Sequence, residues 1–366
     1  MKKNSKILVK ILFLCGLFLI TLSASYFYLS YKKIVVKRSE GAETTPAPTP
    51  TPDPLRIRNI LLLGYAGGTH DGASLTDTMI LLRIYPKDKK ILLISIPRDL
   101  WVPIPVSKNE TQYFKINHSF AIGLDDKKFP DKEEKYRGLY GAGSLTRHAV
   151  NIVTGLEPDN FVAINFSGFK SIVDDLGGVQ VNVPYSFEDK YYPIEGLEKD
   201  TCGKDEAEIK ALTATMSGDL LEKEFTCRYE TLKFQKGLSA LDGETALKFV
   251  RSRHSETNGN DFGRALRQQI FLVGIKNKLL KIGSLTKIVS IVNTLTKNVI
   301  TDIDLNTAFQ IASEQETFSD FKIESISLTT DNVLMESLSS DRQYILISKD
   351  GEGNWENVHK FIEENI

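Results

Sequence analysis

The segment "TMILLRIYPKDKKILLISIPRD" (residues 78–99) decides the fold class. It holds two apolar runs, each long enough for a buried strand, separated by a short polar stretch around Pro86–Lys90. Two such runs joined by a short turn favour an antiparallel hairpin. The preceding "IRNILLLGY" (57–65) is a third apolar run and ends in glycine, which also indicates a buried strand. These three strands predict a sheet, and the folded domain therefore begins near Leu55.

Helix patterns alternate with further strand patterns along the rest of the chain. "SLTRHAVNIVTG" (144–155) has an N-cap serine, apolar residues at helical spacing and a closing glycine. Asp242 would cap a short helix, and a longer helix would start at Asp261 or just after it and run to about Lys281. Other expected elements are a strand, a helix and a strand over 160–184, helices at 284–298, 305–315 and 354–365, and strands at 321–328 and 343–348. We expect a mixed α/β (α+β) fold, with a central mixed β-sheet flanked by helices.

The N-terminal region predicts a membrane anchor. From Ile11 to Tyr31 the chain has no charged residue, which matches the roughly 20 residues that a helix needs to cross a bilayer. A cleaved signal peptide is the alternative, with Ser23–Ser25 as its cleavage site. We favour an uncleaved anchor, because the apolar run continues past that site and its aromatic residues suit a membrane interface.

The sequence divides into four parts on this interpretation. Residues 1–38 are a cytoplasmic N-terminus and transmembrane helix, and residues 39–54 are a linker rich in Pro and Thr, which forms neither helix nor ladder and serves as an extended spacer. Residues 55–283 form the main domain. Within it, residues 188–230 lack periodicity and are rich in Lys and Glu, so we interpret them as a surface insertion. Residues 284–366 form a C-terminal α/β extension packed on the same domain.

Charge argues against nucleic acid as a partner. The 366-residue chain has a formal charge of −1, with 41% hydrophobic and 25% charged residues, as in a globular protein. The first 38 residues hold eight Lys or Arg and no acid, so residues 39–366 hold 38 basic and 47 acidic residues, a balance of −9. Broad nucleic-acid binding needs an excess of positive charge.

The cysteines leave one structural question open. Cys15 lies within the predicted anchor, and Cys202 and Cys227 lie in one polar segment of the main domain. The last two could form a disulfide in an oxidising compartment, or could remain reduced. No spacing of Cys and His typical of a structural metal site is present.

Four arginines gather in "RSRHSETNGNDFGRALRQQ" (251–269). Arg264 and Arg267 are three residues apart near the start of the expected long helix, where free N–H groups already favour anions. Arg251 and Arg253 would point the same way if that segment is extended. A solvated helix face with local ion pairs is the alternative. Four arginines in one short stretch of an acidic domain favour an anion site, because arginine binds phosphate bidentately.

Carboxylates lie at the ends of the strands next to this proposed site. Asp77 precedes the second strand, and Asp99 follows Arg98 at the end of the third. Carboxylates beside a phosphate site commonly hold Mg²⁺, whereas acids in turns or caps are the alternative. His70 beside Asp71 does not indicate a transition-metal site, because the surrounding stretch "AGGTHDGAS" is an ordinary glycine-rich loop.

These motifs together resemble the LytR–CpsA–Psr family of cell-envelope proteins. The matching stretches, in the family's order, are "NILLLG", "TDTMILLRI", "LLISIPRDLWVPIP", "KIN" (115–117), "NFSGFKSIVDDLGGVQV", "LDGETALKFVRSR" and "NDFGRALRQQ". They cover about residues 57–282 and leave the last 80 or so residues outside. The N-terminal anchor and spacer also fit.

The resemblance implies an extracytoplasmic phosphotransferase in the cell membrane with a single transmembrane helix. Such an enzyme moves a glycopolymer, for example teichoic acid or capsular polysaccharide, from a polyprenyl-pyrophosphate carrier to peptidoglycan. Arg98, Arg251, Arg253, Arg264 and Arg267 would hold the pyrophosphate. A catalytic group of Arg98, Asp99 and Asp261 would act on it, with the two acids orienting arginines or one of them serving as base.

The metal site implied by the resemblance is the least complete part. Asp77 would bind Mg²⁺, or Mn²⁺ in its place. The family often has a second aspartate where this chain has Ala66, and an arginine where it has Leu75. Asp71 is the candidate replacement for the missing carboxylate.

Two further functions stay open from the sequence. A polyprenyl-pyrophosphate phosphatase or hydrolase would use the same charged cluster with water as acceptor. A non-catalytic regulatory or lipid-binding module of the envelope would need the arginines but not turnover. The polyprenyl chain would need an apolar groove, with ordinary core packing as the alternative reading of the candidates Val150, Ile152, Ile270, Phe271 and Val273.

Overall fold

The structure is a computed structural model. It describes residues 56–68, 72–216, 219–255, 261–281 and 320–366, with residues 29, 32, 35–37, 294–295, 297–304 and 307; at 219, 261 and 262 only the backbone is described.

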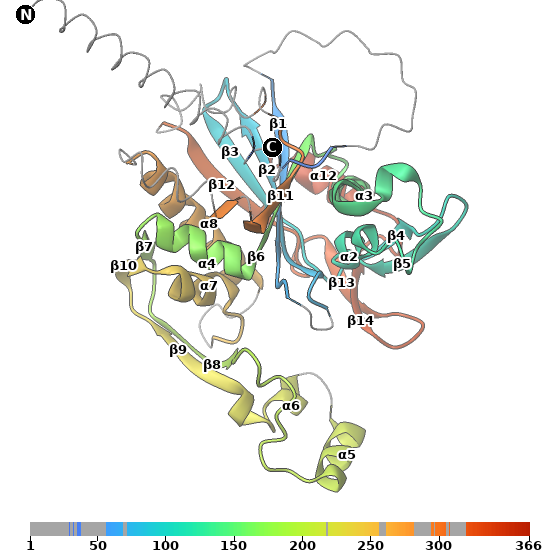
Figure 1. Ribbon diagram of the computed structural model, residues 1–366, viewed down its shortest axis with the longest axis vertical. Coiled ribbons are helices and arrows are strands. Elements are labelled where there is room, and N and C mark those ends of the chain that lie inside the picture. Colours follow the sequence, from blue (N-terminus) through green and yellow to red (C-terminus); the bar gives the residue numbers. More distant parts are fainter. Residues whose placement is uncertain are drawn as a thin grey trace, which may run out of the picture.

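A six-stranded mixed sheet forms the centre of the molecule (Figure 1). Its strands lie in the order β11–β6–β1–β2–β3–β12, with bounds β1 Arg58–Tyr65, β2 Thr76–Tyr85, β3 Lys90–Ser95, β6 Asn160–Asn165, β11 Val299–Thr301 and β12 Lys322–Ser327. β2 is antiparallel to both β1 and β3, whereas β6 is parallel to β1 and β12 is parallel to β3. The predicted hairpin is thus β2–β3, and the expected mixed sheet is confirmed.

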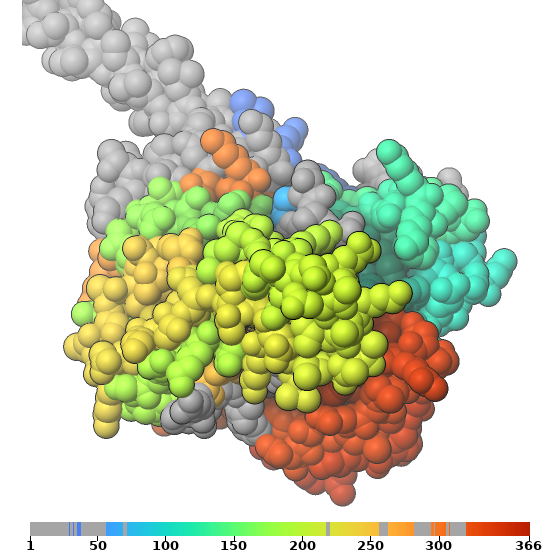
Figure 2. Space-filling model, turned by 90° about the horizontal axis from the view of Figure 1, so that it is seen from below, coloured from blue at the N-terminus to red at the C-terminus, as the bar shows by residue number. Residues whose placement is uncertain are grey.

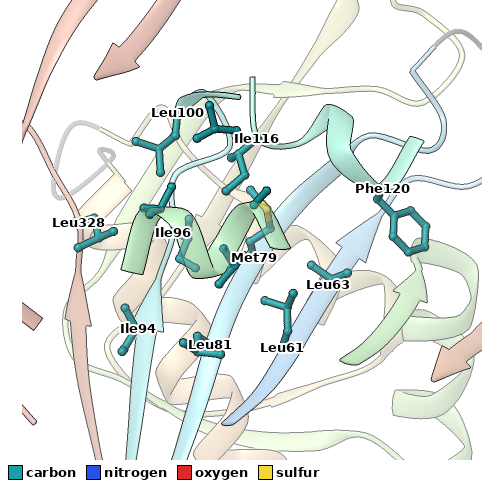
Figure 3. Close-up of a cluster of buried hydrophobic side chains, with 14 of the residues drawn as sticks. Leu61, Leu63, Met79, Leu81, Ile94, Ile96, Leu100, Ile116, Phe120 and Leu328 are labelled. Atoms are coloured by element: carbon teal, nitrogen blue, oxygen red, sulfur yellow. The ribbon is translucent and has the colours of Figure 1, made fainter. Parts of the chain in front are cut away.

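The strands β1, β2 and β3 are buried on both faces of the sheet, which explains their continuous apolar runs. Successive side chains of a strand point to opposite faces. Leu61 and Leu63 therefore enter the larger core, together with Leu81 and Ile94. Figure 3 draws several residues of this core. Ile60 of the same strand enters a smaller core on the other face. A strand that serves two cores cannot show polar alternation.

Different elements cover the two faces (Figure 1). The larger core packs against helices and two small ribbons, with bounds α2 His118–Leu124, α3 Gly138–Thr154, α12 Glu356–Glu363, β4 Trp101–Pro105, β5 Thr111–Lys115, β13 Leu334–Leu338 and β14 Tyr344–Ser348. On the other face α8 (Asp261–Leu279) contacts β12. α8 also joins a separate core with α4 (Phe166–Asp175), α7 (Gly243–Arg251), β7 (Val179–Val183) and β10 (Gly237–Leu241).

A two-stranded arm extends from this second core. Its ribbon pairs β8 (Phe187–Pro193) with β9 (Tyr229–Phe234), and its tip holds α5 (Glu206–Thr215) and α6 (Asp219–Glu222). The arm also holds the short 3₁₀ turn η2 (Thr226–Arg228), whereas the 3₁₀ turn η1 (Glu134–Tyr136) comes just before α3. Residues 188–230 had shown no periodicity in the sequence, yet they form most of this arm, which projects from the body in Figure 1. That they are a surface insertion stays a prediction.

Helix α3 begins earlier than predicted. It starts at Gly138 instead of just after Ser144, although it does end at Gly155 in the left-handed conformation. Gly141 and Gly143 lie in this added first part of the helix, although glycine is a poor helix former. In the fold they permit close packing: a Cβ on Gly143 would lie 2.1 Å from the Phe161 ring, and one on Gly141 would lie 2.1 Å from the Tyr136 backbone.

The predicted membrane anchor, residues 11–31, lies outside the described residues except for Leu29. Within the described part of the chain, every helix is too short or too polar to cross a bilayer. Most of the helices expected at 284–298 and 305–315 also lie outside that part. The predicted strands near 321–328 and 343–348 and the terminal helix correspond to β12, β14 and α12.

Candidate functional site

Asp77, Arg98 and Asp99 meet where β2 begins and β3 has ended. Arg98 Nη1 donates to Asp77 Oδ1, and Arg98 Nε lies 3.6 Å from Asp99 Oδ2. Lys115, on β5, donates from Nζ to Asp99 Oδ1 at 2.8 Å. The two acids therefore hold Arg98 from both sides, and the side chain of Arg98 keeps 34% of its surface exposed.

A second group of cations comes from the segment after α7. Arg251 and Arg253 would have pointed the same way if their segment were extended. In the structure Arg251 is the last residue of α7, and the chain leaves the helix at Ser252. The helix continues that far because Phe249 and Val250 still pack into the second core. The Arg251 guanidinium donates to the Tyr192 hydroxyl at 3.1 Å and lies 4.2 Å from the centroid of the Phe166 ring.

A fully buried carboxylate shapes the loop that carries Arg253. Asp189 of β8 is 0% exposed, and its Oδ2 accepts from Ser252 Oγ at 2.7 Å. The same oxygen accepts from the backbone N–H groups of Arg253 (3.0 Å) and His254 (3.2 Å). The other oxygen accepts from the N–H of Tyr191 at 3.0 Å. A buried carboxylate needs such donors, and here they fix the loop between α7 and α8 to the base of the arm.

These groups surround one cavity of ≈ 230 Å³. Arginines 98, 251, 253 and 264 line it together with Asp77 and Asp189. The remaining wall comes mostly from the arm, with Tyr191, Tyr192, Pro193, Glu222 and Tyr229. Four of the five arginines predicted to bind pyrophosphate are therefore brought together, although they come from two stretches of sequence about 150 residues apart.

Arg267 has a different position from the other arginines. It is 2% exposed, donates from Nη2 to the Ser252 carbonyl, and lies with its guanidinium 4.9 Å from the centroid of the Phe187 ring. Burial lowers the pKa of Arg267 to about 10. The sequence placed it on one face with Arg264, but the residues that line the cavity in the described chain include Arg264 and not Arg267. Its contacts suit a residue that holds the loop in place.

The predicted metal site is only partly visible. Asp77 lines the cavity. Ala66 follows β1 in a turn whose next residue, Gly67, has φ +77 and would place a Cβ 2.9 Å from Asn165. Asp71 lies outside the described residues, and Asp261 is described only as the first backbone position of α8. Asp77 is thus the metal-ligand candidate that can be placed.

The cavity-lining residues that sequence reasoning missed are Asp189 and the arm tyrosines. They lie at the edge of a stretch without periodicity, so no pattern singled them out. Lys115 did carry a signal, because it opens the "KIN" stretch, but that stretch gave it no role. Its contact with Asp99 depends on the pairing of β4 with β5, which places Lys115 opposite Trp101.

The residues suggested for an apolar groove belong mainly to the interior. Val150 is 0% exposed in the larger core, and Phe271 is 4% exposed in the second core. Ile152 and Ile270 pack against those cores. Ordinary core packing therefore accounts for these four.

The fold and the cavity define a class: a mixed α/β protein with an arginine-lined cavity that also holds carboxylates. The chain belongs to the LytR_cpsA_psr family, whose model matches residues 26–357. The sequence resemblance had been placed at 57–282, and that limit was wrong. The family match includes β12, which pairs with β3 in the central sheet.

Curated relatives of this chain are named as transferases. It is 27% identical over 317 residues to the polyisoprenyl-teichoic acid–peptidoglycan teichoic acid transferase TagU of Bacillus licheniformis, covering 85% of this chain and 83% of that protein. It is 25% identical to the polyisoprenyl-teichoic acid–peptidoglycan teichoic acid transferase TagV of Bacillus subtilis, covering 84% of this chain and 64% of that protein.

Solved structures share the fold. The crystal structure of B. subtilis TagV superposes with a TM-score of 0.53 at 23% identity, covering 85% of this chain and 97% of that one. A structure of TagT bound to LIIa-WTA gives a TM-score of 0.54 at 23% identity, covering 90% of this chain and 97% of that one.

Proposed function

We propose that this protein transfers a glycopolymer, carried on a polyprenyl pyrophosphate, to peptidoglycan. The single observation that carries the proposal is the convergence of four arginines on one cavity beside Asp77. Guanidinium groups bind phosphate oxygens bidentately and stay charged, so this cavity suits a group with two adjacent phosphates. Membership of the family and the names of the relatives point to the same reaction.

The proposed reaction is a phosphoryl transfer. A peptidoglycan hydroxyl attacks the phosphorus attached to the sugar, a new O–P bond forms, and the bond to polyprenyl phosphate breaks. Negative charge grows on the transferring and leaving oxygens, and preorganised arginines stabilise it. Arg98 is preorganised by Asp77 and Asp99, and Arg251 by Tyr192.

The two remaining acids take different roles in the proposal. Asp99 is held by Arg98 and Lys115, so we assign it to orienting Arg98. This leaves Asp261, at the first position of α8, as the candidate base for the attacking hydroxyl.

The carboxylate oxygens present fit a magnesium ion that takes most of its ligands from the substrate. Mg²⁺ commonly binds through one or two carboxylates together with phosphate oxygens, and Asp77 supplies one carboxylate on a wall of the cavity. Asp71 is the second candidate ligand. The ion would neutralise charge on the phosphate oxygens. Mn²⁺ has the same preference for oxygen ligands.

The reaction is placed outside the cell in this proposal. Residues 11–31 would anchor the protein in the membrane by one helix, and residues 39–54 would separate the domain from it. A disulfide joins Cys202 to Cys227, and such bonds persist in oxidising compartments outside the cytosol.

The test is a transfer assay with the full-length chain in detergent. Labelled polyprenyl-pyrophosphate glycopolymer is incubated with Mg²⁺ and peptidoglycan, and the label that becomes covalently attached to the glycan is measured. We expect attached label that disappears when the divalent ion is chelated. Release of free glycopolymer phosphate with no attached label would favour a hydrolase instead, and tight binding without either product would favour a regulatory module.

A further inference from the structure

The part of the cavity lining that the arm supplies differs in chemistry from the arginines. Tyr191 and Tyr229 lie with ring centroids 5.8 Å apart and planes at 72°, and both are partly exposed. Glu222 of α6 lines the same cavity. Aromatic rings next to a carboxylate form a surface that suits a sugar, because a ring packs on the C–H face of a pyranose and a carboxylate accepts from its hydroxyls.

A β-bulge explains why the arm can offer these groups together. The register of β8 against β9 shifts between Asp189 and Tyr192. In a regular strand Tyr191 and Tyr192 would point to opposite faces, whereas a bulge re-aims side chains. Both tyrosines consequently line the cavity: Tyr192 is buried against Arg251, and Tyr191 stays partly open.

Glu222 differs from the other acids of the cavity. Asp77 pairs with Arg98, and Asp189 accepts from four donors. No ion pair or side-chain hydrogen bond engages the Glu222 carboxylate within the described residues, and the residue is exposed. It can therefore accept hydrogen bonds from a ligand without first breaking a contact inside the protein.

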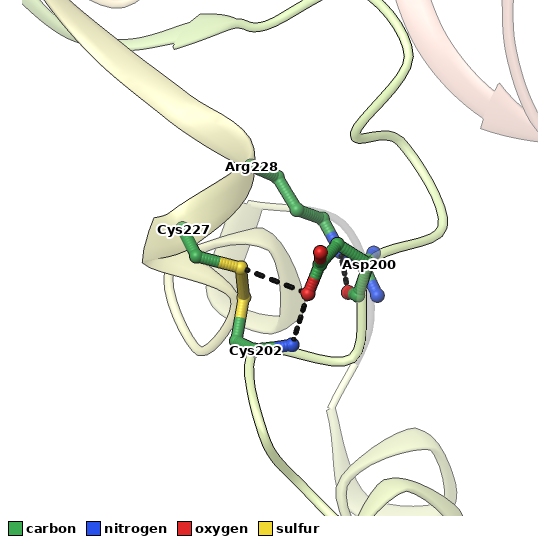
Figure 4. Close-up of a disulfide and its surroundings, with 4 residues drawn as sticks. All are labelled: Asp200, Cys202, Cys227 and Arg228. Carbon is green, nitrogen blue, oxygen red and sulfur yellow. Dashed lines mark hydrogen bonds between the residues drawn. A yellow bond between two sulfur atoms is a disulfide. The ribbon is translucent and has the colours of Figure 1, made fainter.

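A disulfide cross-links the arm near these residues (Figure 4). The Cys202–Cys227 disulfide closes the segment that carries α5 and α6, and Cys227 stands two residues before Tyr229. Asp200 accepts from the N–H of Cys202 at 2.7 Å, and its carbonyl accepts from Arg228 Nε at 2.6 Å. Seen from below in Figure 2, the arm tip lies in front of the body.

We propose that the arm wall, defined as Tyr191, Glu222 and Tyr229, is the subsite for the acceptor sugar of the transfer. The inference rests on the proposed function, and it assigns one wall of the cavity to each substrate. The arginine wall holds the pyrophosphate of the donor. The arm wall holds a neutral pyranose of the glycan acceptor, with Glu222 accepting a hydrogen bond from one of its hydroxyls.

The experiment separates binding of the two substrates in the full-length chain. The variants are Tyr229→Ala and Glu222→Ala, with Tyr113→Ala and Glu195→Ala as controls. Tyr113 is an exposed tyrosine of the β4–β5 ribbon, and Glu195 is an exposed acid of the arm; neither lines this cavity. Initial rates are measured against the concentration of a soluble peptidoglycan oligosaccharide, and equilibrium binding of the labelled donor is measured separately.

We expect the KM for the acceptor to rise about tenfold in Tyr229→Ala and in Glu222→Ala, with donor affinity within twofold of the parent and both controls unchanged. Circular dichroism and the thermal midpoint check that each variant is folded. An unchanged acceptor KM in both arm variants would overturn the inference. So would a loss of donor affinity in them, because the wall would then bind the donor's sugar.

An Arg253→Ala variant in the same assays distinguishes two outcomes: a wrong acceptor subsite and a wrong proposed function. If it loses donor affinity while the arm variants behave like the parent, only the acceptor subsite is wrong. If it keeps full donor affinity, the pyrophosphate site itself is wrong.

Discussion

The two walls of the cavity are held in place by different physical means. Arg98 follows a central strand of the sheet, and Arg251 ends a helix whose apolar face is buried in the second core. The arm wall stands on a two-stranded ribbon, and such a ribbon is marginally stable by itself. Its tip depends on one disulfide and a few polar contacts. The proposed phosphate-binding arginines thus lie on the sheet and on a packed helix. The proposed sugar-binding residues lie on the arm, which a disulfide cross-links.

The largest expected effect is on the arginine wall. Arg98→Ala removes a cation at the proposed phosphate site, and we expect the transfer rate to fall by about 10²–10³-fold, as for loss of one preorganised donor to a developing anion. The free energy of unfolding should change little, since the side chain is one-third exposed. The measurement is the initial rate of label transfer at saturating substrates. A variant that keeps the parent rate would remove Arg98 from the mechanism.

The second effect is confined to the arm. Replacing both cysteines, as Cys202→Ser with Cys227→Ser, opens a loop with a sequence separation of 25. Chain entropy then predicts a loss of about 3 kcal/mol in local stability. Hydrogen exchange should speed up in β9 and α5 while β1 keeps its protection. Equal acceleration in both regions would mean that the arm and the sheet unfold as one unit.

The third effect links the two walls. Asp189→Ala leaves the hydroxyl of Ser252 and the N–H groups of Arg253 and His254 without their buried acceptor, which should cost about 2 kcal/mol in the free energy of unfolding. Donor affinity should also fall, because the loop that carries Arg253 loses its attachment. Urea unfolding followed by tryptophan fluorescence measures the first quantity. Asp205→Ala, which removes an exposed N-cap of α5, is the control for loss of a carboxylate in the arm. If Asp189→Ala binds the donor as tightly as the parent, Asp189 does not position the loop that carries Arg253.

The smallest expected effect is the pH dependence of the free energy of unfolding, through two histidines on helices that pack on the larger core. Burial lowers the pKa of His118 and His148, which belong to α2 and α3. Below pH 6.5 the unfolded histidines take up protons that the folded ones do not, so stability falls as the pH drops through that range. We expect a loss on the order of 1 kcal/mol between pH 7 and pH 5.5. The double variant His118→Gln with His148→Gln should flatten this dependence in urea unfolding, and an undiminished slope would assign it to other groups.

β1, β2 and β3 could be predicted from the sequence because they are buried on both faces of the sheet. Such strands appear as continuous apolar runs, and the short turn between β2 and β3 identified their hairpin. The start of α3 was misplaced, since glycines that weaken a helix in isolation are required here by close packing against Phe161. The arm escaped prediction because its strands depend on each other and on a disulfide more than on a regular apolar pattern.

The sequence by itself determined which residue types the site would contain. Four arginines in one short stretch of an acidic domain require an anion or a set of counter-charges, whatever the fold, and Asp77 and Arg98 stood at strand ends where side chains are both rigid and reachable. Only the tertiary structure decided how these groups are divided. It buried Arg267 against Phe187. It placed Arg264 in the lining of one cavity with Arg98, Arg251 and Arg253, and it lined the same cavity with the arm tyrosines. The physical reason is that sequence spacing fixes neighbours along one helix or strand, whereas contacts between elements depend on how their apolar faces pack.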